Sequence, residues 1–210
     1  MTNLAILSCL FGLSTAASWP NGPFTTSGSS ILDASGNSIK YAGANWPGAA
    51  DVMIPEGLQY QSVASIVAKL TEAGVNVIRL TYAIELIDQI YENDGVDVPI
   101  STAFVEALGE ANGTAVFKEV LAANPSFSAN ITRLEVFDAI AEECAAHEIY
   151  VHLDNHISTG TWCCSTDDGN AWWGDEDFSI ANWTRGISYM ADHVSPTTHP
   201  PIPSAVDHHN

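Results

Sequence analysis

Three polar side chains at alternate positions of one apolar segment are the first candidates for chemistry in this chain. The segment Ile149-Tyr-Val-His-Leu-Asp-Asn-His156 spaces His152, Asp154 and His156 two residues apart. Alternation along a strand brings side chains with this spacing to one face. They could form a metal site, although zinc requires three or four ligands of matching reach. Alternatively, the three residues form no metal site and have separate roles: one histidine lies in the interior, the aspartate bonds to backbone or to an arginine, and the other histidine lies at the rim.

A single arginine lies in the β-branched segment Val75–Leu80. A buried arginine is costly unless a carboxylate pairs with it. At the carboxyl end of a strand, Arg79 would face a catalytic or substrate anion. The alternative is a structural salt bridge with Asp154 or Glu85.

Tryptophan and asparagine residues cluster near the ends of the predicted strands. Aromatic faces can stack on the C–H faces of sugar rings, and asparagine side chains can bond to sugar hydroxyls. Each tryptophan alone is better explained by core or loop packing, but the set together favours a carbohydrate ligand. The set comprises Trp46, Trp162, Trp172 and Trp173, with Asn45, Asn155 and Asn170.

Carboxyl groups near the strand ends are the candidates for bond cleavage. Glycoside hydrolysis needs two of them, about 5–5.5 Å apart in retaining enzymes and about 6.5–9.5 Å apart in inverting ones. No two of the acidic residues form a convincing pair in the sequence, so we interpret most of them as solvated loop residues. They are Glu85, Asp154, Asp167, Asp168, Asp175 and Glu176.

Alternating strand and helix patterns must position these side chains. The predicted strands are 41–46, 75–80 and 149–153, and the predicted helices are 62–73, 84–91, 114–123, 132–146 and 179–192. A hairpin is predicted where 30–33 and 38–41 flank Ala34-Ser-Gly-Asn37. Parallel strands joined through helices in this order predict an α/β fold. A (β/α)8 barrel needs eight units and about 250 residues. We therefore predict a partial TIM barrel with about the first three βα units.

Charge and the two ends of the chain suggest a secreted protein. The 210 residues include 25 acidic and 6 basic ones, a net charge of −19, which argues against nucleic acid and anionic membranes as partners. The short apolar segment 4–13 predicts a signal peptide at 1–17, and no membrane association is expected after its removal. Residues 194–210, rich in proline and histidine, predict a disordered tail. No cofactor and no specific protein partner are expected. Glycosylation is predicted at the sequons of Asn112, Asn130 and Asn182.

Three motifs, in order and spacing, resemble the first three strands of glycoside hydrolase family 5: Gly43-Ala-Asn-Trp-Pro-Gly48, Gly74-Val-Asn-Val-Ile-Arg-Leu80 and Tyr150-Val-His-Leu-Asp-Asn-His156. The loop with Trp162-Cys-Cys-Ser165 and Asp168-Gly-Asn-Ala-Trp-Trp173 is similar to that of fungal secreted, cellulase-like members. The resemblance implies a barrel that cleaves β-glycosidic bonds with retention. It implies that Arg79 supports the nucleophile and that His156 lines the subsite beside the scissile bond. It places Asn45 and Trp46 at the end of the first strand.

The family pattern ends early in this chain. The family carries its acid/base glutamate in an Asn-Glu pair after the fourth strand and its nucleophile after the seventh. The chain has no Asn-Glu dipeptide and no glutamate after Glu176. Residues 18–193 are therefore expected to form a truncated catalytic domain without either glutamate, inactive by itself, and the tail from Val194 is interpreted as translated intron. The full-length form would hydrolyse a β-glucan. The alternatives are a non-catalytic carbohydrate-binding remnant and a metal-dependent hydrolase using His152, Asp154 and His156.

Overall fold

The computed structural model describes residues 22–163, 169–170 and 174–194. The predicted signal peptide at 1–17 and the tail beyond Val194 lie outside the described residues, as do Trp172 and Trp173. The chain divides into two compact units between Ile39 and Lys40, and each is described by itself.

The first unit is a small antiparallel sheet. Strands β1 (Thr25–Ser27), β2 (Ser30–Leu32) and β3 (Ser38–Ile39) pair in that order. The turn between β2 and β3 is held by Asp33, whose carboxylate accepts the backbone N–H groups of Ser35 and Asn37 at 2.9 and 2.8 Å. These bonds, led by that from Asn37, lower the pKa of Asp33. The hairpin predicted from turn chemistry is confirmed.

The second unit contains a parallel sheet of three strands, in the order β4 (Gly43–Trp46), β5 (Val77–Ala83) and β6 (Tyr150–Ile157). The strands predicted at these places are confirmed, but β6 is longer than expected. The polar run from Asp154 to His156 continues the strand to Ile157 and does not begin a loop. The strand extends because β5 offers backbone partners as far as Ala83.

Six helices connect and follow these strands in the described part of the chain: α1 (Val63–Glu72), α2 (Ile84–Glu92), α3 (Ile100–Leu108), α4 (Glu110–Ala123), α5 (Arg133–Ala146) and α6 (Ile180–His193). The side chain of Ser62 caps α1. A capping box of Thr132 and Glu135 starts α5. The sequence did not predict α3, which begins at Ile100 after the N-cap residue Pro99 and has no side-chain capping bond. No helix in the described ranges has the length and apolar character to span a membrane.

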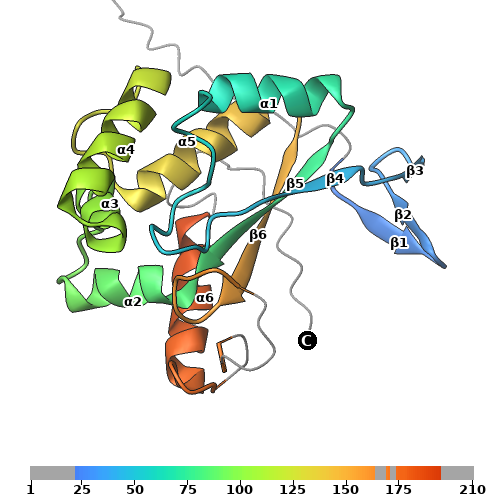
Figure 1. The fold of residues 1–210 in the computed structure, drawn as a ribbon. Coiled ribbons are helices and arrows are strands. Elements are labelled where there is room, and N and C mark those ends of the chain that lie inside the picture. The colour runs from blue at the N-terminus through green and yellow to red at the C-terminus, as the bar shows by residue number, and fades with distance from the viewer. Residues whose placement is uncertain (1–21, 164–168, 171–173, 195–210) are drawn as a thin grey trace, which may run out of the picture. The chain divides into compact units, whose positions relative to one another are not determined.

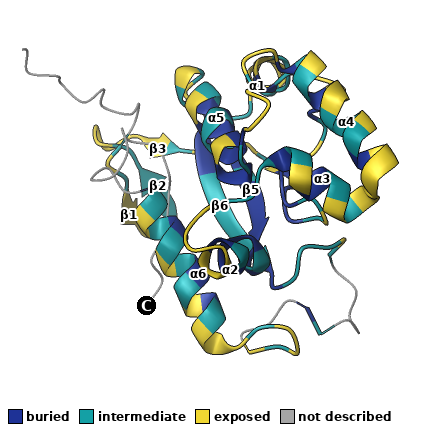
Figure 2. Ribbon diagram, turned by 90° about the vertical axis from the view of Figure 1, so that its left-hand side faces the viewer, coloured by how far each residue is buried: buried dark blue, intermediate teal, exposed yellow. Residues whose placement is uncertain are grey.

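The core of this unit lies between the sheet and its helices. Figure 1 shows α1, α3, α4 and α5 on one side of the sheet. Ile78 and Leu80 of β5 and Val151 of β6 point to that side and are fully buried, as is Ile140 of α5. Burying each such side chain contributes about 1.5–3 kcal/mol. Buried residues follow β5 and the inward sides of the helices, and exposed ones face outward (Figure 2).

Candidate functional site

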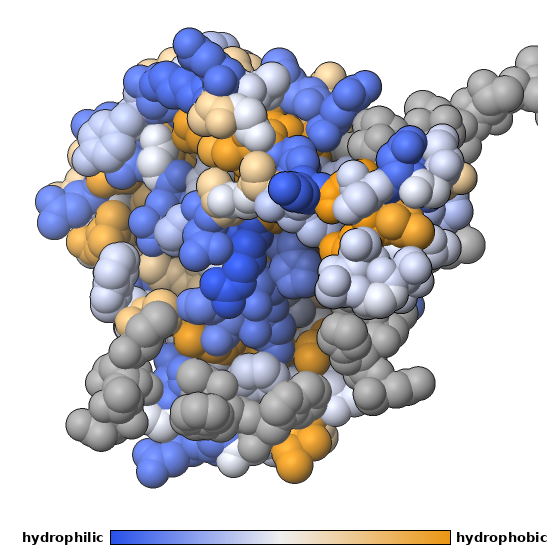
Figure 3. Space-filling model, turned by 90° about the vertical axis from the view of Figure 1, so that its right-hand side faces the viewer, coloured by the Kyte–Doolittle hydropathy of each residue, from blue (hydrophilic) through white to orange (hydrophobic). Residues whose placement is uncertain are grey.

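The sheet face opposite the core carries a row of polar side chains. Parallel pairing places Asn45 of β4 beside Arg79 of β5, and Arg79 beside His152 of β6. Because side chains alternate along a strand, these three residues share the face away from Ile78 and Leu80. The side of the molecule seen in Figure 3 has a hydrophilic zone at its middle. This face of the sheet is therefore polar, as required for a polar ligand.

Arg79, Asp154 and His156 form a compact network on this face. Nη2 of Arg79 lies 2.8 Å from Oδ2 of Asp154, and Nδ1 of His156 lies 2.8 Å from the same oxygen. The Asp154 and His156 side chains are 18% and 20% exposed, and that of Arg79 is 41% exposed. The salt bridge to Asp154, one of the two given as the alternative role of Arg79, is present, so one carboxylate orients both Arg79 and His156.

The contacts determine how the His156 ring is held. Nδ1 also lies 3.2 Å from Nη2 of Arg79. A guanidinium only donates, so the consistent assignment has both Arg79 and the Nδ1–H of His156 donating to Asp154. The other ring nitrogen, Nε2, lies 3.1 Å from Sγ of Cys163, a disulfide-bonded cysteine. The imidazole is thus held at both nitrogens.

A buried tyrosine lies within the field of this network. Tyr82 is 3% exposed. Burial, and secondarily the negative charge of Asp154, raise the pKa of its phenol above the ordinary value. The phenol therefore stays protonated at any physiological pH and can act only as a neutral group.

The geometry does not favour the metal-site hypothesis for His152, Asp154 and His156. Among the residues that the structure describes, no group of three or more histidine, cysteine or acidic side chains is placed to hold a metal ion. The Asp154 oxygen nearest His156 is bonded to the Arg79 guanidinium. A cation placed there would have to displace Arg79.

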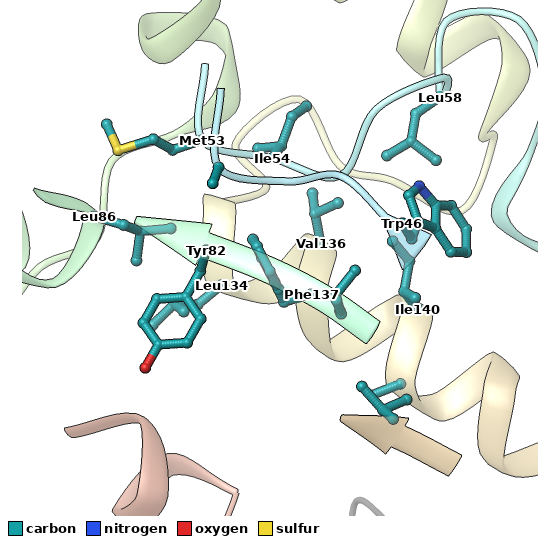
Figure 4. Close-up of a cluster of buried hydrophobic side chains, with 14 of the residues drawn as sticks. Trp46, Met53, Ile54, Leu58, Tyr82, Leu86, Leu134, Val136, Phe137 and Ile140 are labelled. Carbon is teal, nitrogen blue, oxygen red and sulfur yellow. The ribbon is translucent and has the colours of Figure 1, made fainter. Parts of the chain in front are cut away.

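Two predicted contact residues do not lie on the polar face. Trp46 is 5% exposed, and its indole N–H donates to the backbone oxygen of Glu56 at 2.9 Å. It belongs to the buried cluster with Leu58 and Ile140 (Figure 4). Both polar side-chain atoms of Asn155 are buried without a hydrogen-bond partner in the described part of the chain. Substrate contact by Trp46 or Asn155 stays a prediction.

Among the described members of the predicted tryptophan set, Trp162 is the exposed one. It follows β6 and is 77% exposed. A large aromatic side chain with this exposure presents a flat apolar face to solvent. The predicted partners Trp172 and Trp173 lie outside the described residues, so Trp162 is the tryptophan of this loop whose exposure can be given.

The loop after β6 is held by polar side chains whose hydrogen bonds go to the backbone. Oδ1 of Asn170 accepts the N–H groups of Ser158 and Thr159 at 3.0 and 2.8 Å. Oδ1 of Asp175 accepts the N–H groups of two following residues. Glu85 accepts the N–H of Gly160 at 2.7 Å. These side chains position the loop.

A second arginine cluster was missing from the sequence prediction. Arg133, 1% exposed, pairs through Nε with Oδ1 of Asp97 at 3.1 Å, and its Nη1 donates to Oε1 of Gln89 at 2.6 Å. Asp97 precedes Arg133 by 36 residues, so no local pattern joins them. The one available signal was an arginine at the first position of a predicted helix.

The three sequons differ in their surroundings. Asn112 and Asn130 are exposed. Asn182 is half-buried, and its Nδ2 donates to Oδ2 of Asp88, a carboxylate that also pairs with Arg185. Glycosylation at all three stays a prediction, and Asn182 is the least accessible of them.

The comparisons with known proteins agree with the motifs. No family model matches the chain. A glycosyl hydrolase 5 family protein of Chamaecyparis obtusa is 30% identical over 198 residues, which cover 93% of this chain and 34% of the relative. The chain thus spans about a third of the length of that curated relative.

Solved structures match the fold. An endocellulase of Pyrococcus horikoshii in complex with cellotetraose superposes with a TM-score of 0.57 and 18% identity, over 86% of this chain and 41% of its own. The catalytic domain of the major endoglucanase of Xanthomonas campestris pv. campestris gives a TM-score of 0.56 and 18% identity, over 83% and 40%. The predicted partial (β/α)8 barrel is therefore confirmed. Over 93% of its length the chain is similar to a glycosyl hydrolase 5 family protein, in agreement with the resemblance of the three strand motifs.

Proposed function

We propose that this chain forms one wall of a cleft that binds a β-linked glucan. The observation that carries the proposal is the Arg79–Asp154–His156 network on the polar face of the parallel sheet. The exposed Trp162 offers a stacking surface on the loop that follows the same strand. Active sites of (β/α)8 enzymes lie at the carboxyl ends of the strands, where Asp154, His156 and Trp162 are found.

Each group of this wall has a distinct role in the proposal. The guanidinium of Arg79, 41% exposed, keeps donors free for sugar oxygens while it pairs with Asp154. Asp154 fixes both Arg79 and the imidazole. Asn45 and His152, beside Arg79 in register, extend the polar row across the sheet. The wall is therefore preorganised, so binding restricts its side chains little further and costs little additional conformational entropy.

Binding is proposed without cleavage for this 210-residue chain. Retaining hydrolysis needs two carboxyl groups about 5–5.5 Å apart. The network supplies one, Asp154, and its charge is paired with Arg79 at 2.8 Å. In a longer protein with the same residues, this wall would orient the glucan for hydrolysis. The expected result is no release of reducing ends from β-glucan by the 210-residue chain, and release would contradict this part of the proposal.

Cellotetraose is the probe for the binding test, because a neighbour in fold is complexed with it. Calorimetric titration of the chain and of His156→Ala is expected to show at least about tenfold weaker binding by the variant, or about 1.4 kcal/mol. His193→Ala is the matched control: Nε2 of His193 lies 2.8 Å from Oδ1 of Asp138 on α5, in a similar pair between helices. Equal losses in both variants, or none in either, would refute the proposed site.

An extracellular location is part of the proposal. The apolar segment 4–13 and the sequons support it, and the proposed ligand is a polysaccharide. N-terminal sequencing of the product from a secreting host is expected to begin at Ser18. A product that stays in the cell with Met1 would contradict it.

A further inference from the structure

A disulfide-bonded cysteine lies directly beside the imidazole of the Arg79 network. Sγ of Cys163 is 3.1 Å from Nε2 of His156, and Cys163 is bonded in a disulfide. It lies in the loop that follows β6 and is half-buried, next to the exposed Trp162. The proposed glucan wall makes no use of this contact between sulfur and imidazole.

Asp154 determines which ring nitrogen of His156 can take up a proton. Nδ1–H of His156 donates to Oδ2 of Asp154 at 2.8 Å, so the neutral ring presents an unprotonated Nε2 to Cys163. A histidine held in this tautomer by a carboxylate acts as a base at its other nitrogen. Asp154, His156 and Cys163 therefore follow the order of carboxylate, imidazole and sulfur that activates a thiol.

The charges around the imidazole favour a thiolate at position 163. With the disulfide intact, the network holds one cation, Arg79, and one anion, Asp154, 2.8 Å apart. Nη2 of Arg79 also lies 3.2 Å from Nδ1 of His156, so a proton added to the ring would meet a like charge. A thiolate at Cys163 would supply a second anion beside Nε2. Proton uptake by His156 and thiolate formation at Cys163 therefore support each other.

The other cysteine that the structure describes has the opposite surroundings. Cys144 is free and fully buried in α5. Burial raises the pKa of its thiol to about 12. A thiol that stays protonated is a poor nucleophile, so Cys144 provides an unreactive internal reference for Cys163.

We propose that the disulfide of Cys163 is a site of thiol–disulfide exchange, in which Sγ of Cys163 is the leaving sulfur and His156 stabilises it. The reactant is a small thiol of the glutathione class. In such an exchange the sulfur whose thiolate is better stabilised leaves faster, and the contact with Nε2 identifies that sulfur as Sγ of Cys163. The inference goes beyond glucan binding, because it assigns a covalent reaction to the chain.

The exchange balances in two steps. The attacking thiol gives its proton to Nε2 of His156 and bonds to the sulfur that is joined to Cys163. The bond between that sulfur and Sγ of Cys163 breaks, and its electron pair leaves with Sγ as a thiolate beside the imidazolium. A second small thiol then cleaves the mixed disulfide. Two small thiols are thereby oxidised to one disulfide, and the protein disulfide is reduced to two thiols.

The test exposes the chain to reduced glutathione at about pH 7.5 and quenches it with iodoacetamide before peptide mass spectrometry. At early times we expect carbamidomethyl on Cys163 and glutathione on the sulfur to which Cys163 was bonded. Cys144 should stay unlabelled. Glutathione on Cys163 itself would overturn the proposal, because it reverses the leaving sulfur. Labelling of Cys144 at the same rate would also overturn it, because exchange would then require unfolding.

Substitution of the imidazole tests its role in the exchange. His156→Gln retains an amide N–H but cannot take up a proton, so exchange is expected to slow at least about tenfold. His193→Gln is the matched control, because Nε2 of His193 lies 2.8 Å from Oδ1 of Asp138 in a similar pair. Its rate should stay within about twofold of the unmodified chain. Equal rates in the two variants would contradict the role of His156.

A second measurement needs no substitution of His156. After reduction, the chain is expected to show about one thiolate by its absorbance at about 240 nm and about pH 6.5, where a thiol with the ordinary pKa of about 8.5 is only about 1% ionised. Cys163→Ser should remove this absorbance. Absence of the thiolate in the unmodified chain, or its persistence in Cys163→Ser, would refute the stabilised leaving sulfur.

The exchange site and the glucan wall fail separately, although both include His156. A chain that binds cellotetraose, but exchanges at the same rate with and without His156, would refute only the exchange site. Exchange at Cys163 in a chain that does not bind cellotetraose would refute only the proposed function.

Discussion

Two aspartate–arginine pairs of the same chemistry should differ strongly in their contribution to stability. In the pair Asp97–Arg133 the side chains are 9% and 1% exposed. In the pair Asp154–Arg79 they are 18% and 41% exposed. Removing one partner of a buried pair costs about 3–5 kcal/mol, because a charge is left buried and uncompensated. An exposed pair, screened by solvent, contributes about 0.2–1 kcal/mol.

Asp97→Ala removes more than the ion pair. The Asp97 carboxylate also accepts the backbone N–H groups of Val98 and Leu134, each at 2.7 Å, and Leu134 lies in the first turn of α5. We therefore expect Asp97→Ala to lower the free energy of unfolding by at least about 3 kcal/mol, against about 1 kcal/mol or less for Asp154→Ala. For a chain of this length, 1 kcal/mol corresponds to about 2–4 °C in melting temperature.

Urea titration followed by circular dichroism measures both variants on one scale, and the substitution is the same at both positions. Melting curves should show a decrease of at least about 6 °C for Asp97→Ala and of at most about 4 °C for Asp154→Ala. Equal decreases, or a larger one for Asp154→Ala, would refute the argument from burial. Glucan binding should show the opposite order, with the larger effect for Asp154→Ala.

Three further predictions concern separate features. Glycopeptide mapping of the secreted chain should find glycan at Asn112 and none at Asn182, whose amide nitrogen is bonded to buried Asp88; full occupancy at Asn182 would contradict the described packing. Gly113→Ala should lower the free energy of unfolding by about 1–3 kcal/mol, because a Cβ there would lie 2.3 Å from a backbone oxygen of α3; a neutral result in urea titration would mean that α3 and α4 separate easily. Burial raises the pKa of the Cys144 thiol to about 12. The stability that the buried, protonated thiol contributes is therefore complete below the unfolded pKa of about 8.5 and is lost as pH rises toward 12. Thiol labelling at pH 8 followed by mass spectrometry should modify Cys144 only after denaturation.

Local sequence patterns predicted most of the elements that surround the site. Within the predicted helix 132–146, Leu134, Phe137 and Ala141 follow helical spacing, and all three residues are buried in α5. The predicted helix 62–73 corresponds to α1, which runs from Val63 to Glu72, with Ser62 as its N-cap and Gly74, at a φ of 76°, just beyond its C-cap. Patterns of this kind succeed because capping and helical periodicity depend on neighbours in the chain.

Predictions about exposure were weaker than predictions about elements. Trp46 and Asn155 were grouped with Trp162 because all three lie near strand ends. Only Trp162 is exposed, while Trp46 is in the core and the amide of Asn155 is buried. Alternation along a strand separates its two faces but does not say which one the helices will cover.

The sequence by itself determined the order of strands and helices, the alternation that put Arg79, Asp154 and His156 on one face, and the resemblance to family 5. Tertiary structure alone decided which partners meet. Arg79 bonds to Asp154 across 75 residues because β5 and β6 pair in one register, and Arg133 meets Asp97 because the long connection folds back onto α5. Such contacts depend on packing between distant segments, and no local pattern encodes that packing.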